Sequence, residues 1–263
     1  MATESIEIIA RVTSGFKRSG HGVPPYTTPM TYTVIARDPS TGQLGIGIAT
    51  YSLAVGASCP YIRPGVAAVS TQAATFPAHG PALLDFLTSG KTFVEAFSRL
   101  RSSDPDFEYR QVGVVIADGK AHVHTGTKTR DWAGSLAGEN WLVMGNVLAG
   151  EQVAAKMAAA LNANPGEPLA ARLVAALEAG RDAGGQVGLN AVHLPERSAV
   201  VLVCGSEPFP VMDLRVDDHP DAVTELRRIF ERFSLADPYY RDRANHPSST
   251  PPQDRWMAEH GMS

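Results

Sequence analysis

Segments with a β-strand pattern come in runs along this chain, and two helical segments rather than one follow each of the first two runs. The first run contains residues 32–36 and 44–49, separated by turn-forming residues at 38–42 as in a β-hairpin, and a third strand at 65–70. Strands that alternate one for one with helices would instead predict a doubly wound parallel sheet. The grouping therefore predicts an α+β fold in which helices cover antiparallel sheets.

The helical segments show apolar residues at helical spacing. One stripe spans residues 83–87 and ends before Gly90, and the next spans 93–100, where Thr92 and Glu95 have the spacing of a capping box. The same order then repeats, with strands at 111–117, 120–125 and 141–144 and helical stripes at 153–161 and 169–177. The last part predicts a hairpin of 189–193 with 199–204, a strand at 212–216 and a helix from Pro220.

Glycines occupy alternate positions in the strand at 44–48, and strand glycines permit the close approach of a neighbouring layer. We expect these glycines to face a second sheet. The fold predicted from the pattern is a sandwich of two mainly antiparallel sheets between layers of helices.

Three regions of the chain differ in composition and in the periodicity of their apolar residues. Residues 1–30 are polar and rich in turn-forming pairs, and we interpret them as an extension that is either flexible or processed. Residues 31–235 carry the strand and helix patterns and form the predicted folded domain. From Ala236 to Ser263, prolines such as Pro238 and a lack of sustained periodicity predict a tail.

The charge balance argues against nucleic acid as a partner. The chain has 23 basic and 27 acidic residues, a formal charge of −4, so no basic excess is present to neutralise nucleic-acid phosphates. No apolar stretch approaches the roughly 20 residues of a membrane span, and residues 5–10 are too short for the core of a signal peptide. We therefore expect a cytoplasmic protein. Cys59 and Cys204 lie in apolar surroundings and are predicted to be buried free thiols.

The usual catalytic signatures are absent from the sequence, but the boundary between Met30 and Thr31 is informative. Thr31 opens the first predicted strand, directly after the segment interpreted as an extension. If translation starts at Met30, or if the extension is cut off, Thr31 gains a free α-amine that can act as general base for its own hydroxyl. An α-amine with a pKa of about 7.7 to 8.0 suits that role. The alternative is an ordinary threonine at the start of a strand.

Several ordered segments carry a resemblance to a known family. They are residues 31–39, 41–49, 65–73, 110–115, 124–126, 132–134, 145–150 and 213–220. This set resembles a bacterial and archaeal family catalogued as domain of unknown function 1028, which is placed among the N-terminal-nucleophile (Ntn) hydrolases. The resemblance implies the four-layer αββα sandwich of that class, with Thr31 as the nucleophile.

The chain departs from the family pattern in two places. Family members commonly begin Met-Thr, whereas residues 1–30 precede Thr31 here. Relatives also carry a short Arg-Gln-Ser-Ala stretch where this chain has Pro195-Glu196-Arg197-Ser198-Ala199. Substrate contacts in the region 186–198 are therefore expected to differ.

The geometry of Ntn hydrolases implies which residues assist the nucleophile. The end of the second strand approaches it and contributes Thr50 and Tyr51, and the end of the third strand contributes Thr71 and Gln72. Asn146 is implied as the donor of an amide N–H to the developing oxyanion. Ordinary hydrogen bonding at strand ends is the alternative for these residues.

Four residues are expected to bind substrate: Tyr51, Arg110, Asp217 and His219. Arg110, like Arg37, is suited to an anionic group of the substrate, and surface ion pairing is the alternative for both arginines.

Two groups of residues have the composition of a metal site, and for both we favour another interpretation. Asp217-Asp218-His219 directly precedes Pro220, where aspartates are typical of the start of a helix. His122 and His124 share one face of a strand, and we interpret them as solvated histidines on a hairpin edge. We predict no bound metal and no cofactor.

Three functions remain open at this point, in order of preference. The first is an amidohydrolase that cleaves a C–N amide bond in a small non-peptide or amino-acid-derived substrate, with an acyl-enzyme formed on Thr31. The second is a catalytically silent ligand-binding or assembly protein, because a fold does not guarantee its usual chemistry. The third is a metal-assisted hydrolase that uses Asp217, His219 and His124. We also expect a homodimer or a higher homo-oligomer.

Overall fold

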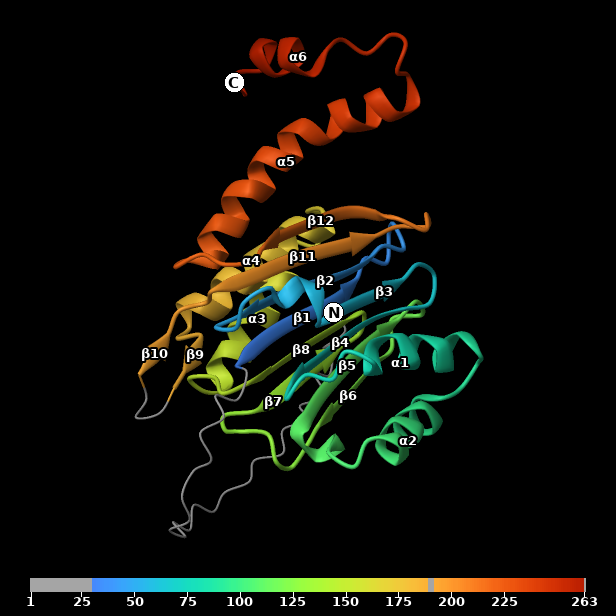
Figure 1. Ribbon diagram of the computed structural model, residues 1–263, viewed down its shortest axis with the longest axis vertical. Helices are drawn as coiled ribbons and strands as arrows, with labels where there is room; N and C mark the ends of the chain where they lie inside the picture. The colour runs from blue at the N-terminus through green and yellow to red at the C-terminus, as the bar shows by residue number, and fades with distance from the viewer. Residues whose placement is uncertain (1–29, 189–191, 263) are drawn as a thin grey trace, which may run out of the picture.

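Antiparallel sheets and six α-helices make up the described part of the chain, which is residues 30–188 and 192–262 of a computed structural model (Figure 1). The mixed α+β class predicted from the sequence is confirmed. The predicted extension lies outside the described residues except for Met30. No helix within the described ranges combines the length and the apolar character that crossing a membrane requires.

The larger sheet has six strands in the order β12-β11-β2-β1-β8-β7. Their bounds are β1 Thr31–Arg37, β2 Leu44–Thr50, β7 Gly134–Gly138, β8 Trp141–Asn146, β11 Ser198–Cys204 and β12 Pro210–Val216. The antiparallel register of β1 places Thr31 opposite Thr50 of β2 on one side and opposite Asn146 of β8 on the other. The next strand along the chain and a strand from a distant part of the sequence therefore meet at Thr31.

The smaller sheet has four antiparallel strands in the order β3-β4-β5-β6. Their bounds are β3 Pro60–Arg63, β4 Ala67–Ala73, β5 Arg110–Ile116 and β6 Ala121–Thr125. Gln72 of β4 lies opposite Gln111 of β5, at the end of both strands. A separate pair of short strands consists of β9 Gln186–Val187 and β10 His193–Leu194.

The helices follow the order that the sequence predicts. Their bounds are α1 His79–Thr88, α2 Phe93–Ser103, α3 Glu151–Ala163, α4 Leu169–Asp182, α5 Ala222–Asn245 and α6 Gln253–Glu259, with short 3-10 helices at Val55–Ala57 and Phe107–Tyr109. The capping box predicted for α2 is confirmed, because the Thr92 hydroxyl accepts a hydrogen bond from the Glu95 N–H and the Glu95 carboxylate accepts one from the Thr92 N–H.

Alternation of side chains along the strands divides the core into three clusters. Val34 of β1 packs in a cluster with side chains of α3, α4 and α5, such as Leu173. Ile35, on the opposite face of β1, belongs to a second cluster with Ala68 and Val115 of the smaller sheet. A third cluster joins β4 and β5 to α1 and α2. The second cluster lies between the two sheets, which is where the candidate site lies as well.

Gly45 and Gly47 of β2 face α4, and not the second sheet as the sequence suggested. A Cβ atom at Gly45 would lie 2.6 Å from Leu173 Cδ1 of α4. The reason is the phase of the alternation, because Ile46 and Ile48 take the positions that face the smaller sheet. The glycines therefore let α4 approach β2 closely.

Three strands, β3, β7 and β9, were not predicted. The segment Gly134-Ser135-Leu136-Ala137-Gly138 of β7 has little strand propensity. The predicted pairing of 189–193 with 199–204 is wrong, since β11 pairs with β2 and β12, and residues 189–191 lie outside the described part. β2 is so distant from β11 in the sequence that their pairing leaves no local signal.

Helix α5 continues past the predicted end of the folded domain at Leu235. It contains Pro238, although a proline inside a helix removes one backbone hydrogen bond. Tyr239 offsets part of this cost, because its ring packs 5.0 Å from that of Trp256 on α6 and its hydroxyl donates to the Pro251 carbonyl at 3.0 Å. Much of the predicted tail is therefore helical, and Figure 1 shows α6 and the end of α5 standing away from the sheets.

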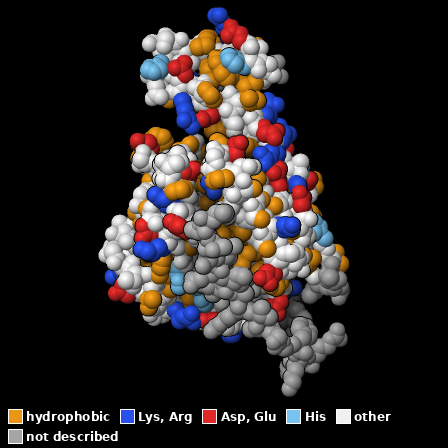
Figure 2. All heavy atoms as spheres, turned by 180° about the vertical axis from the view of Figure 1, so that it is seen from behind, with side chains coloured by type: hydrophobic (Ala, Val, Ile, Leu, Met, Phe, Trp, Pro, Cys, Tyr) orange, Lys and Arg blue, Asp and Glu red, His pale blue; other side chains and the backbone are white. Residues whose placement is uncertain are grey.

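Two predictions from composition can be compared with the structure. Cys59 and Cys204 are buried free thiols, as predicted. Figure 2 shows basic and acidic side chains interspersed on one face of the molecule, which agrees with the near balance of charges in the sequence.

Gly45→Ala is expected to destabilise the protein by about 1 to 3 kcal/mol, the usual cost of overpacking a core. The added methyl group would lie 2.6 Å from Leu173 Cδ1 and 3.0 Å from Leu169 Cδ2, so these buried side chains of α4 must move. Urea-induced unfolding followed by circular dichroism measures the change. Gly166→Ala is the matched control, because a Cβ atom at that position meets nothing within 4 Å. Equal stabilities of the two variants would contradict the close packing of α4 on β2.

Candidate functional site

A group of polar side chains lies between the two sheets at one end of the strands. We call it the polar layer, and its members are Thr31, Thr33, Thr50, Gln72, Gln111 and Asn146. Each of them is at most 2% exposed. They share this interface because each lies an even number of positions from an apolar residue of the inter-sheet cluster, such as Ile35 on β1 or Val115 on β5. Buried polar groups of this kind must find hydrogen-bond partners within the protein.

Thr31 is linked to Thr50 by a chain of hydrogen bonds. The Thr31 hydroxyl donates to Thr50 Oγ1 at 3.2 Å, and the Thr50 hydroxyl donates in turn to the carbonyl oxygen of Met30. The carbonyl group next to Thr31 therefore has its oxygen bound by the hydroxyl of Thr50. The N–H of Ser52 also donates to Thr50 Oγ1, at 3.2 Å.

Two backbone carbonyls set the orientation of the amide groups in the polar layer. Gln111 Nε2 donates to the carbonyls of Gly134 and Gly145, at 3.2 and 3.0 Å. A carbonyl only accepts hydrogen bonds, so this end of Gln111 must be the NH₂ group and the other end must be its oxygen. Gln111 Oε1 then accepts from Gln72 Nε2 at 2.8 Å and from Asn146 Nδ2 at 3.2 Å.

The same reasoning fixes the free ends of the other two amides. Gln72 Oε1 accepts a hydrogen bond from the Thr33 hydroxyl. Asn146 Oδ1 is buried and has no hydrogen-bond partner in the described part of the chain. Asn146 was predicted to donate its amide N–H to an oxyanion, and its Nδ2 donates one of its two N–H groups to Gln111. The Asn146 atom that has no partner beside Thr31 is the acceptor Oδ1.

Two predicted site residues lie apart from the polar layer. Thr71 is adjacent to Gln72 in β4, so its side chain points to the opposite face of the sheet, and its hydroxyl donates to the Phe76 carbonyl at 3.4 Å. Tyr51 follows the end of β2 and is 37% exposed, and its N–H donates to Gln186 Oε1 at 3.0 Å.

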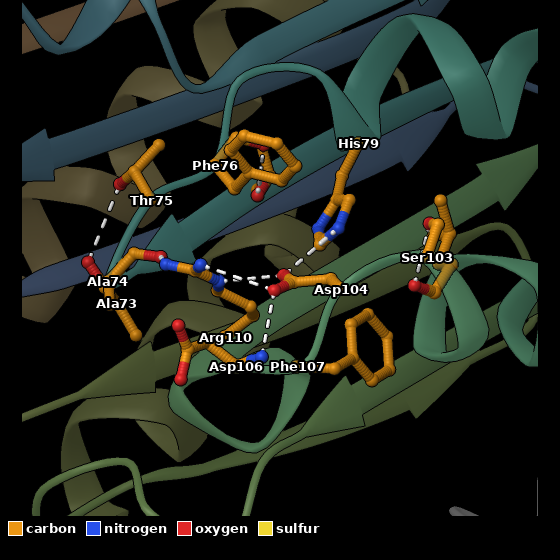
Figure 3. A network of polar contacts seen from close by, with 12 residues as sticks. Ala73, Ala74, Thr75, Phe76, His79, Ser103, Asp104, Asp106, Phe107 and Arg110 are labelled. Atoms are coloured by element: carbon orange, nitrogen blue, oxygen red, sulfur yellow. Dashed lines mark hydrogen bonds and ion pairs between the residues drawn. The ribbon is translucent and has the colours of Figure 1, made fainter.

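Arg110, which was predicted to bind substrate, is instead paired within the protein (Figure 3). Its Nε lies 2.9 Å from Asp104 Oδ2, and its Nη1 donates to the Ala74 carbonyl at 2.6 Å. Burial acts to raise the pKa of Asp104, but the hydrogen bonds from Arg110 and from the Asp106 N–H outweigh it, and the pKa is lowered. Asp104 is therefore ionised and neutralises Arg110.

His79 faces the same carboxylate, as Figure 3 shows. Its Nε2 lies 3.3 Å from Asp104 Oδ2, and its ring packs edge-on against Phe76 and Phe107. Burial lowers the pKa of His79 and outweighs the opposing attraction of Asp104. His79 is therefore neutral near pH 7. The cluster of His79, Asp104 and Arg110 stabilises the connection between β4 and α1.

Asp217 and His219 lie beyond the end of β12, and only His219 lines a pocket. The pocket has a volume of about 310 Å³ and is lined by Pro195, Arg197, Asp218, His219 and Pro220. It adjoins the polar layer, because the Arg197 N–H donates to the Thr50 carbonyl at 2.7 Å. Asp217 is exposed, and its carbonyl accepts from the Ala54 N–H at 2.9 Å. The residue that caps α5 is Asp221, whose side chain accepts from the Thr224 N–H.

The candidate metal ligands of β6 have other partners. His122 packs between Phe93 and Phe97, and His124 stacks on Phe107, with ring centroids 4.1 Å apart. Both are half-buried and not solvated as predicted, because α2 covers His122 and the 3-10 helix that begins at Phe107 covers His124. Across residues 30–188 and 192–262, no three His, Cys, Asp or Glu side chains converge as metal ligands would.

The two cysteines are not candidates for a nucleophile. Burial raises the pKa of the Cys59 thiol and of the Cys204 thiol, so neither is appreciably ionised near neutral pH.

Sequence reasoning missed Thr33, Gln111 and Arg197. A signal existed for Thr33, because it lies two positions from Thr31 in a strand and so shares its face. Gln111 also shares a face with Val115, but its partners Gln72 and Asn146 depend on strand pairing that the sequence does not show.

Comparisons with known proteins agree on one family. The model described as "Family of unknown function (DUF1028)" matches residues 31–226. A crystal structure of protein SPO2555 from Silicibacter pomeroyi, which carries the same family model, is similar at 28% identity over 78% of this chain and 86% of that one, with a TM-score of 0.70. No curated protein matches the sequence.

Two further solved structures are more distant. They are Anbu, an ancestral beta-subunit, from Yersinia bercovieri, at 14% identity over 78% of this chain and 95% of that one with a TM-score of 0.37, and an Anbu mutant from Hyphomicrobium sp. strain MC1, at 12% identity over 80% and 96% with a TM-score of 0.38. TM-scores this low do not establish that Anbu and this chain share a fold.

His79→Leu is expected to reduce the loss of stability on acidification. Because the pKa of His79 is lower in the folded state than its usual value near 6.5, the unfolded chain binds a proton more readily, and stability falls as the pH drops below about 6.5. The leucine variant lacks the group that takes up this proton. The slope of its free energy of unfolding against pH is therefore shallower by up to about 1.4 kcal/mol per pH unit. Urea unfolding between about pH 7.5 and pH 5 measures the slope.

The control for this measurement is His193→Leu, which replaces an exposed histidine of β10. It is expected to leave the slope unchanged. Asp104 does not affect the slope between about pH 5 and about pH 7.5. Because its pKa is lowered in the folded state, the stability that the ionised carboxylate contributes is lost only below about pH 3.8. An unchanged slope in His79→Leu would contradict the account of its burial.

Proposed function

We propose, from the premise that this chain belongs to the DUF1028 family, that it is an Ntn amidohydrolase. It cleaves a C–N amide bond in a small non-peptide or amino-acid-derived substrate, with Thr31 as the nucleophile after its α-amine is exposed. The observation that carries the proposal is the chain of hydrogen bonds from the Thr31 hydroxyl through Thr50 to the Met30 carbonyl. This chain supports the proposal because a hydroxyl that could act as nucleophile lies beside a hydroxyl that donates to a carbonyl oxygen.

The arrangement of the core supports the four-layer αββα fold as part of the proposal. One cluster lies between the larger sheet and α3 to α5, one between the sheets, and one between the smaller sheet and the pair α1 and α2. In this arrangement the nucleophile sits at the end of a central strand, β1, where both neighbouring strands contribute polar groups.

Exposure of Thr31 changes two hydrogen bonds at once. When Met30 is absent, the Thr50 hydroxyl loses its acceptor and becomes a free donor at the place where a carbonyl oxygen was bound. We assign Thr50 as the group that stabilises the oxyanion of the substrate. One such donor is typically worth a factor of about 10² to 10³ in rate.

The second change concerns the new α-amine of Thr31. In its protonated form the amine is a strong donor, and Asn146 Oδ1 is an unpaired acceptor on the residue opposite Thr31. We assign Asn146 as the residue that orients the amine, through its oxygen rather than its N–H. Gln72 and Gln111 hold Asn146 in place through the amide network.

The reaction then proceeds in two steps. The Thr31 hydroxyl attacks the substrate carbonyl while the α-amine takes its proton, and the proton passes to the leaving amine as the C–N bond breaks. A water molecule, deprotonated by the same α-amine, hydrolyses the ester on Thr31 Oγ1. An amine whose pKa lies near 8 can both accept and return the proton at neutral pH.

Two routes expose Thr31, and both remain open. Translation from Met30 followed by removal of that single residue is one, and processing of residues 1–30 is the other. Cytoplasmic location, a homo-oligomeric state and the absence of a cofactor stay predictions from the sequence.

Protein expressed from its own gene, with both possible start codons kept, is expected to begin at Thr31. Intact mass and amino-terminal sequencing determine this directly. A β-lactone, whose strained carbonyl acylates a nucleophilic hydroxyl, is expected to add one equivalent to Thr31 and none to Thr31→Ala. A chain that retains residues 1–30 and takes up no reagent would favour the ligand-binding function instead.

Thr50→Val is expected to slow acylation of Thr31 by the β-lactone about 10²- to 10³-fold, because it removes the oxyanion donor and keeps the shape of the side chain. The rate is read from the growth of the adduct mass with time. Thr41→Val is the matched control, since Thr41 is exposed in the turn between β1 and β2, at the opposite end of those strands. Equal rates in Thr50→Val and Thr41→Val would contradict the role of Thr50.

A further inference from the structure

The pocket beside Thr50 is held in shape by backbone hydrogen bonds. It lies where the segment before β11 meets the segment between β12 and α5. The His219 N–H donates to the Arg197 carbonyl at 2.8 Å, and the Ala222 N–H donates to the Glu196 carbonyl at 3.1 Å. Pro195 and Pro220 line the pocket and restrict the backbone of the two segments. The side chains that line the pocket therefore start from a fixed frame.

Arg197 has an unused hydrogen-bonding edge in this pocket. Its Nε and Nη2 both contact one oxygen of Asp218, at 3.1 and 2.6 Å. Its Nη1 has no partner within the described residues. The guanidinium group carries five N–H donors in a planar fork, so a second edge remains for two oxygens of a ligand.

His219 adds an imidazole ring to the pocket. Its Nδ1 lies 2.9 Å from the Asp221 carbonyl oxygen and 3.1 Å from the Asp221 backbone nitrogen, and its Nε2 has no partner in the described part of the chain. The pocket therefore combines a permanent cation with a second nitrogen that a ligand can contact. The planar guanidinium group suits an anion with two oxygens in one plane.

We propose that this pocket binds the carboxylate of the substrate, and that the substrate is a small amide that carries one. The inference rests on the proposed function, because Thr31 must act on the other end of the same molecule. Ser198, Thr50 and Thr31 are aligned across β11, β2 and β1, and neighbouring strands are about 4.8 Å apart, so Arg197 starts roughly 10 Å from Thr31. An amino-acid-derived amide spans that distance together with the long arginine side chain.

Asp218 has a defined place in this proposal. Its carboxylate competes with the ligand for the same guanidinium, so the ion pair is the resting state of the pocket. Removing the charge of Asp218 therefore strengthens binding, whereas removing Arg197 weakens it. Opposite effects from two adjacent partners would not arise from general damage to the fold.

The test measures binding of hippurate (N-benzoylglycine) and of its uncharged amide to the full chain by titration calorimetry. Hippurate is expected to bind at least about tenfold more tightly than the amide, and Arg197→Ala is expected to remove that difference. Asp218→Asn is expected to tighten hippurate binding about two- to fivefold, in line with the strength of an exposed ion pair. Inorganic phosphate serves as a third probe.

Arg215→Ala is the matched control for Arg197→Ala. Arg215 pairs with Asp213 on β12 and is exposed to the same extent, 39% against 40% for Arg197, but it does not line the pocket. It should leave hippurate binding unchanged. Equal binding of hippurate and its amide, no binding of either, an effect of Arg215→Ala equal to that of Arg197→Ala, or weaker binding by Asp218→Asn would overturn the proposal. Tighter binding of phosphate than of hippurate would overturn the assignment to a carboxylate.

The result is separable from that of the proposed function. Binding of hippurate does not require the Thr31 hydroxyl, so Thr31→Ala should bind it as tightly as the parent. Hippurate binding by a chain whose Thr31 is inert towards the β-lactone supports the carboxylate site and refutes the hydrolase. Acylation of Thr31 without selective binding of hippurate refutes only the carboxylate site.

Discussion

The hydrogen bonds from Gln111 to the carbonyls of Gly134 and Gly145 determine the orientation of every amide group in the polar layer. Because carbonyls cannot donate, Gln111 must present its oxygen to Gln72 and Asn146. Six buried polar side chains between two sheets would be costly unless nearly all were paired. The Gln111 constraint orients the amides, and the Met30 carbonyl orients the hydroxyls of Thr50 and Thr31 in the same way. The only side-chain group of the layer left unpaired in the described residues is Asn146 Oδ1.

The unpaired oxygen and the Thr50 hydroxyl are complementary to the two groups that exposure of Thr31 would create. Chain cleavage before Thr31 adds a donor, the α-amine, and removes an acceptor, the Met30 carbonyl. Asn146 Oδ1 is an acceptor without a donor, and cleavage supplies the α-amine as that donor. Cleavage also leaves the Thr50 hydroxyl as a donor without an acceptor. A polar layer built only for stability would give no reason for this match, since an unpaired buried acceptor costs free energy.

The sequence identified residues at the ends of strands better than it identified the face of the sheet on which each side chain lies. Thr50 and Gln72 were selected as strand ends next to Thr31, and Asn146 as a possible oxyanion donor, and all three lie in the polar layer. Thr71 was selected by the same rule but lies on the other face, because one position along a strand reverses the direction of a side chain. Gln111 depends on which strands pair across the sheets, and pairing between distant segments has no local signature. Pro238 indicated the end of a helix, which the packing of Tyr239 on Trp256 overrides.

Thr50 connects the chemistry at Thr31 to the pocket at Arg197. Its hydroxyl faces Thr31 and Met30, whereas its backbone carbonyl accepts the N–H of Arg197. A strand in the middle of a sheet has little freedom, since β2 is hydrogen-bonded to β1 and β11 on its two sides. The distance between the nucleophile and the guanidinium is therefore set mainly by the sheet, and only the side chain of Arg197 can adjust it. A site built in this way selects its ligands by length as well as by charge.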